Sequence, residues 1–62
     1  MPVVRVSWFE GKGHAQKAKV AAEITESIAR HTATDPKHIY VIFDDVKPSD
    51  WAAEGKLFAP SP

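Results

Sequence analysis

Residues 39–43 read Ile-Tyr-Val-Ile-Phe, an unbroken run of apolar, β-branched and aromatic side chains. Such residues favour extended structure. A run without polar alternation is typical of a strand that is buried on both faces, as in a parallel sheet. Parallel strands are joined by a crossover, which is usually a helix. The run therefore predicts the second strand of a βαβ unit.

The first strand and the helix of this unit are predicted N-terminal to the run. Residues 2–9 place polar side chains between valines and aromatics, which predicts a strand. Two glycines within residues 10–13 indicate a turn. From about His14 to Thr32 the spacing is helical. One stripe of that helix carries Val20, Ala21, Ile24, Ile28 and His31. We expect His31 to be a packed histidine.

The C-terminal tail is predicted to begin at Asp44, after the second strand. Ser49 is expected to cap a short helical turn that carries Trp51. Residues 52–58 are expected to form a small hairpin around Gly55, which is too short to be stable unless it docks on a neighbour. Residues 60–62 are expected to fray.

A chain of 62 residues supplies one domain, residues 1–62, with a marginal core. Small domains are usually reinforced by disulfides, a metal or oligomerisation. The sequence has no cysteine, and its three histidines (His14, His31 and His38) match no short zinc motif, so we expect no metal site. Two strands and one helix also leave one sheet face uncovered. Together these features predict a symmetric oligomer.

The charge pattern argues against two classes of partner. Eight basic and eight acidic residues cancel, and no basic run is present, so binding to nucleic acid is not expected. No apolar stretch approaches the roughly 20 residues that span a bilayer. The N-terminal sequence lacks the layout of a signal peptide. We therefore expect a cytoplasmic protein without nucleic-acid or membrane partners.

The Met1-Pro2 pair is the sharpest chemical feature. Removal of a methionine before a small residue would expose Pro2 as a secondary amine. An amine whose pKa lies near neutrality is a good general base, and apolar surroundings or a nearby cation lower an amine pKa. The alternative interpretation is structural, since proline is tolerated at the start of an edge strand.

Several features together resemble the 4-oxalocrotonate tautomerase family over nearly the whole chain. They are the length, the Met-Pro opening, the βαβ pattern, the turn Glu10-Gly11-Lys12 and the pair Gln16-Lys17. The resemblance implies an α/β (α+β) fold, a βαβ unit with a short C-terminal hairpin, assembled as a homo-hexamer from three dimers. It also implies an isomerase that needs no cofactor. Such an enzyme interconverts the enol (dienol) and keto forms of a small unsaturated 2-oxo acid.

The resemblance assigns roles to four residues. Pro2 matches the catalytic base. Lys12 stands where the family usually has an arginine that binds the substrate carboxylate, and lysine lacks the bidentate fork. Tyr40 stands where the family has a second arginine from a neighbouring subunit; a phenol can donate a hydrogen bond to a developing enolate but carries no positive charge. Trp51 stands near a tail aromatic and would supply an apolar wall.

Each substrate-binding assignment has a structural alternative. Lys12 would then be a solvated turn residue, Tyr40 a core strand aromatic with its hydroxyl at the surface, and Trp51 a staple to the next subunit. Two functional alternatives also stay open. One is a hydratase or dehalogenase of an unsaturated acid that recruits Asp44 or Asp45, although adjacent strand residues face opposite ways. The other is a non-catalytic scaffold subunit of a hetero-oligomer, which the absence of both arginines motivates.

Overall fold

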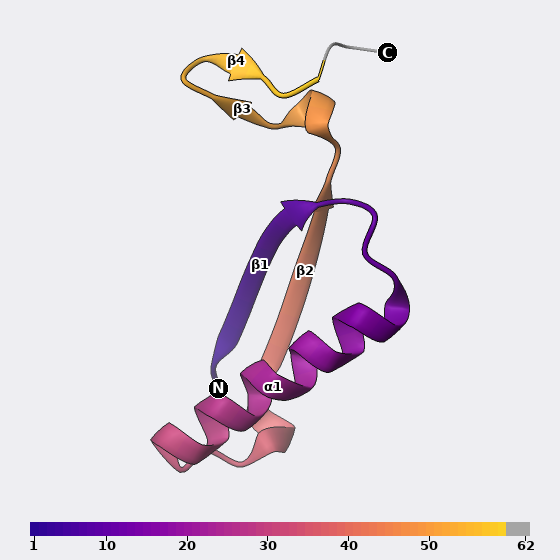
Figure 1. The fold of residues 1–62 in the computed structure, drawn as a ribbon. Coiled ribbons are helices and arrows are strands. Elements are labelled where there is room, and N and C mark those ends of the chain that lie inside the picture. The colour runs from indigo at the N-terminus through magenta and orange to yellow at the C-terminus, as the bar shows by residue number, and fades with distance from the viewer. Residues whose placement is uncertain (60–62) are drawn as a thin grey trace.

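The computed structural model describes residues 1–59 and confirms the predicted βαβ unit with a C-terminal hairpin (Figure 1). The elements are β1 (Val3–Phe9), α1 (His14–Thr32), β2 (Tyr40–Val46), β3 (Ala52–Ala53) and β4 (Lys56–Leu57). Short 3₁₀ turns, Pro36–His38 and Pro48–Asp50, precede β2 and β3. The fold class is α+β, as predicted. Residues 60–62, which were expected to fray, lie outside the described part.

β1 and β2 form a parallel pair whose register runs from Val3 opposite Tyr40 to Phe9 opposite Val46. The predicted start of the tail at Asp44 is wrong, because β2 continues to Val46. Aspartate is a poor strand former, yet here each carboxylate has a partner across the pair. The hydroxyl of Ser7 donates to Asp44, and the indole of Trp8 donates to Asp45.

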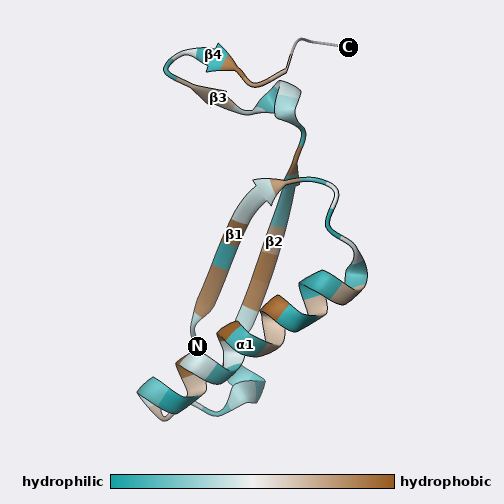
Figure 2. Cartoon of the chain, viewed as in Figure 1, coloured by the Kyte–Doolittle hydropathy of each residue, from teal (hydrophilic) through white to brown (hydrophobic). Residues whose placement is uncertain are grey.

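The helix α1 covers only one face of this strand pair (Figure 1). Alternate residues of β1 and β2 are half-buried beneath it: Val4, Val6, Trp8, Val41 and Phe43. The opposite face stays open, with Val3 50%, Tyr40 51% and Ile42 37% exposed. Hydrophobic residues of both strands are visible as brown bands in Figure 2. The prediction that residues 39–43 are buried on both faces is therefore not met within one chain.

The helix begins and ends where the sequence predicts. Gln16 reaches back so that its side-chain oxygen accepts the Gly13 N–H at 3.0 Å, which satisfies a donor at the helix start. Ala33 ends the helix with a left-handed backbone, φ 54°. The prediction for His31 is wrong: it is exposed, and its Nδ1 lies 2.8 Å from the Ser27 carbonyl oxygen. Within residues 1–59, no helix is long and apolar enough to cross a bilayer.

The connection to the hairpin differs from prediction in one detail. The turn Pro48–Asp50 is preceded by Lys47 at the cap position, so Ser49 is not the cap. Proline is favoured at the first helical position, because its missing N–H would have no partner there. The hairpin itself is confirmed, and its two loop residues, Glu54 and Gly55, both have positive φ. This backbone matches the twist of a tight hairpin.

A single chain is not a compact globule. Its Cα radius of gyration is 14.9 Å, whereas roughly 10.6 Å is expected for a compact domain of this length. Among residues 1–59 only Ile39, at 8% exposed, counts as buried. The hairpin extends beyond the end of the strand pair (Figure 1). The chain thus leaves apolar surface uncovered on the open sheet face and on the hairpin.

Candidate functional site

The predicted site residues fall into two groups at opposite ends of the strand pair. Pro2 and Tyr40 form the first group, where the Tyr40 N–H donates to the Pro2 carbonyl oxygen at 3.0 Å. Pro2 is half-buried, and Met1 before it is 81% exposed. Tyr40 lies on the open face of the sheet, so its own chain does not bury it as a core aromatic.

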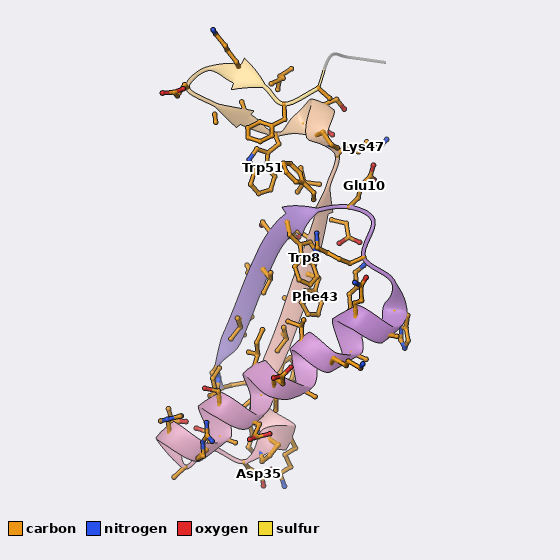
Figure 3. All side chains as sticks on the ribbon, in the orientation of Figure 1. Trp8, Glu10, Asp35, Phe43, Lys47 and Trp51 are labelled. Atoms are coloured by element: carbon orange, nitrogen blue, oxygen red, sulfur yellow. The ribbon has the colours of Figure 1, made fainter. Side chains whose placement is uncertain are left out.

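Lys12 and Trp51 form the second group, beyond the C-terminal ends of β1 and β2. Lys12 lies in the loop that follows β1, and Trp51 follows the turn after β2. The rings of Trp51 and Phe58 both pack on the ring of Phe9, with centroid distances of 4.7 Å and 5.4 Å. Figure 3 shows Trp51 beside the strand end, below the hairpin. These three aromatics make an apolar cluster next to the β1–α1 loop.

The two groups cannot form one site within a single chain. The strand β1 has seven residues, and at about 3.3 Å per residue it spans roughly 23 Å. A small acid is much shorter than this distance. The part of the chain that the structure describes also contains no pocket. Pro2 and Lys12 can therefore meet the same small ligand only if they come from different copies.

Lys12 lies in the loop after β1, is half-buried and makes its contacts within its own chain. Its ammonium donates to the Phe9 carbonyl oxygen at 3.0 Å and lies 5.0 Å from the centroid of the Trp8 ring. Gly11, with φ 117°, supplies the backbone turn that brings this side chain back over β1, a conformation that other residues rarely adopt.

Beneath Lys12 lies a cluster that the sequence analysis did not identify. Trp8 stacks on Phe43 with centroids 4.9 Å apart and planes 8° apart, and Figure 3 shows the two rings between the strands and the helix. The indole Nε1 of Trp8 donates to Asp45 at 2.8 Å, and Lys17 forms an ion pair with the same carboxylate. The hydrogen bond from Lys17, and then that from Trp8, lower the pKa of the Asp45 carboxyl.

Asp44 and Asp45 point to opposite faces, as predicted, and so do not form a dyad. Asp45 faces the helix with both oxygens occupied, and Asp44 lies on the open face, 3.4 Å from the Ser7 hydroxyl. Both residues pair with the C-terminal half of β1, away from Pro2 in the same chain. No contact in residues 1–59 favours their recruitment to activate water.

Comparison with known proteins shows the family of this chain. A family model described as "Tautomerase enzyme" matches residues 2–60. A probable tautomerase of Ralstonia nicotianae is 66% identical over 62 residues, which are 100% of this chain and 95% of that protein. A probable tautomerase of Lactococcus lactis subsp. lactis is 50% identical over 46 residues, or 74% of this chain and 75% of that protein.

Solved structures share the fold. A crystal structure of a 4-oxalocrotonate tautomerase homologue has a TM-score of 0.89 and 29% identity, covering 100% of this chain and 98% of that one. A heterohexameric 4-oxalocrotonate tautomerase from Chloroflexus aurantiacus has a TM-score of 0.86 and 25% identity, covering 97% of each chain. The chain therefore belongs to the 4-oxalocrotonate tautomerase family of the tautomerase superfamily.

Proposed function

We propose that this protein is an isomerase that interconverts the enol (dienol) and keto forms of a small unsaturated 2-oxo acid. Pro2, freed of Met1, takes a proton from the substrate and returns it to a different atom, so the product has the same composition. The observation that carries this assignment is membership of the family together with a proline at position 2. The exposure of Met1 is compatible with its removal.

In this proposal the site is composite. Two chains related by a two-fold axis across their strands would bring the Pro2 end of one β1 beside the Lys12 end of the other. Lys12 and Trp51 of one copy would then bind the carboxylate and apolar body of an acid that reacts at Pro2 of the second copy. Tyr40 would donate a hydrogen bond to the developing enolate. The assembly is a cytoplasmic homo-hexamer built as a trimer of dimers.

The chemistry of these side chains defines what the site would do well. The Lys12 ammonium supplies a point charge for one carboxylate, without the bidentate geometry of a guanidinium. Tyr40 polarises a carbonyl only as a neutral donor, so it stabilises an enolate less than a cation would. An apolar wall at Trp51, next to Phe9 and Phe58, would keep the proline amine in its neutral, basic form by disfavouring its charged form.

The direct test is ketonisation of 2-hydroxymuconate, followed by ultraviolet absorbance, on protein shown by mass to lack Met1. Pro2→Ala, processed in the same way, is the matched variant. We expect turnover in the wild type and a loss of about 100-fold or more in Pro2→Ala, since general-base catalysis contributes 10²–10⁴-fold. Equal rates in the two proteins would exclude the proline mechanism. An inactive wild type would favour the scaffold alternative or another acid substrate.

Subunit mixing tests the composite site separately. Pro2→Ala and Lys12→Ala proteins, each inactive or weak alone, are unfolded together and refolded as a mixture. A dimer with one copy of each variant contains one doubly altered site and one intact site. Random pairing therefore restores about a quarter of wild-type activity. A mixture that is no more active than the average of its parents would place both residues in one chain and contradict the proposal.

A further inference from the structure

The side chain of Lys12 rests on a layered stack. Phe43 covers one face of the Trp8 indole at 4.9 Å, and the Lys12 ammonium lies over the ring at 5.0 Å. Because the Phe43 ring occupies one face of the indole, the ammonium lies over the other face. The aromatic face attracts a cation electrostatically. One N–H of Lys12 is used by the Phe9 carbonyl oxygen, which leaves two donors for a ligand.

The indole that carries Lys12 is itself held at its edge. Its Nε1 donates to Oδ1 of Asp45, while Oδ2 of the same carboxylate pairs with Lys17. Trp8 belongs to β1, Asp45 to β2 and Lys17 to the first turn of α1. One carboxylate therefore joins three elements and anchors the Nε1 edge of the ring. Charge-assisted hydrogen bonds of this kind are stronger than neutral ones.

We propose that Trp8 and Asp45 are positioning residues that hold the Lys12 ammonium ready for the substrate carboxylate. This inference rests on the proposed function, in which Lys12 binds that carboxylate. A lysine has a flexible four-carbon stem and lacks the planar fork of arginine, so it loses more conformational freedom on binding. The indole face and the Phe9 carbonyl restrict that freedom before the ligand arrives, which improves affinity through preorganisation.

The test compares a monoacid with its uncharged ester, because only the acid presents a carboxylate to Lys12. The substrates are phenylenolpyruvate and its methyl ester, and the variant is Trp8→Phe, which keeps a ring on Phe43 but removes the Nε1 donor. We expect KM for the acid to rise about tenfold, below the ~100-fold cost of a 1 Å misplacement, with kcat little changed. KM for the ester should not change.

Asp45→Asn is the second variant, because it preserves side-chain size and an oxygen acceptor for Trp8 while removing the charge that pairs with Lys17. We expect KM for the acid to rise about threefold, less than in Trp8→Phe, because the hydrogen bond from Trp8 remains. KM for the ester should not change. This variant keeps the test decisive if Trp8→Phe folds poorly. Thermal melting and sedimentation of each variant establish that assembly is intact.

A double-mutant cycle separates positioning from general structural damage. If Trp8 acts through Lys12, then Trp8→Phe has no further effect on KM for the acid in a Lys12→Ala background. An equal effect in both backgrounds, or equal changes for acid and ester, would overturn the inference. A wild type that turns over neither compound would instead contradict the proposed function, so the two failures are distinguishable.

Discussion

The two faces of the β1–β2 pair differ in what covers them. The face under α1 is partly covered within the chain, where Trp8 stacks on Phe43 and Lys17 pairs with Asp45. The open face leaves Val3, Tyr40 and Ile42 between 37% and 51% exposed, and nothing in residues 1–59 of the same chain covers them. Contacts within the chain therefore specify the covered face, whereas the open face depends on assembly.

The largest effect is expected from a charge on the open face. Ile42→Asp would place a carboxylate where a second copy should pack, and burying an unpaired charge costs several kcal/mol per copy. We expect the oligomer to dissociate and ketonisation to be lost, measured by sedimentation velocity and absorbance. Lys19→Asp, on an exposed helix position, is the control and should assemble normally. Normal mass and activity in Ile42→Asp would show that this face is not an interface.

The face under the helix should respond with lost stability. Phe43→Ala removes the ring that stacks on Trp8. Truncation of a fully buried phenylalanine costs 3–5 kcal/mol, and because Phe43 is half-buried we expect about 2 kcal/mol, measured by urea unfolding. Lys37→Ala, at an exposed position of the turn before β2, is the control and should cost little. An equal loss in both variants would mean that the stacking of Phe43 on Trp8 does not stabilise the fold.

The ion pair on the covered face predicts a pH dependence. Lys17 holds the pKa of Asp45 below its ordinary value, so the ionised form stabilises the folded state. That contribution is complete above the carboxyl pKa of the unfolded chain, near 3.8, and is lost as pH falls through the lower folded value. Asp45→Asn should therefore be less stable than wild type by a constant amount at pH 5–8, with a difference that shrinks below about pH 4.

Urea midpoints at several pH values, at fixed protein concentration, measure this difference. Asp50→Asn removes an exposed carboxylate from the turn Pro48–Asp50 and serves as the control. Its difference from wild type should stay small at every pH. If Asp45→Asn differs from wild type by the same amount at pH 3 as at pH 7, the pair with Lys17 does not stabilise the fold.

Local pattern was enough to predict most of the fold. The helix His14–Thr32 was predictable because its apolar residues recur at helical spacing and glycines precede it. The C-terminal end of β2, beyond Asp44, was not predictable. Aspartate disfavours strands, and the partners that compensate for this lie 37 residues away in the sequence. His31 was misplaced because a helical stripe indicates direction only, while the sheet beneath it ends before that turn.

The candidate site was predictable only as a set of residues. Pro2, Lys12, Tyr40 and Trp51 came from the family pattern, and their roles stay predictions. Their separation into two ends of the sheet follows from the parallel direction of β1 and β2, which the βαβ pattern already predicts. The contact of Lys12 with Trp8, and of Trp8 with Asp45, depends on strand register, which places Trp8 opposite Asp45.

The smallest effect is expected on the outer surface of α1. Arg30 lies 3.9 Å from Glu26 one turn earlier, and their side chains are 64% and 73% exposed. Such pairs stabilise a helix by about 0.3 kcal/mol, so Arg30→Ala should change the urea midpoint barely measurably and leave assembly intact. A large loss of stability or a change in oligomer mass would mean that the outer face of α1 also contacts another copy. The division into one covered and one open face would then be incomplete, because the helix itself would be shared between chains.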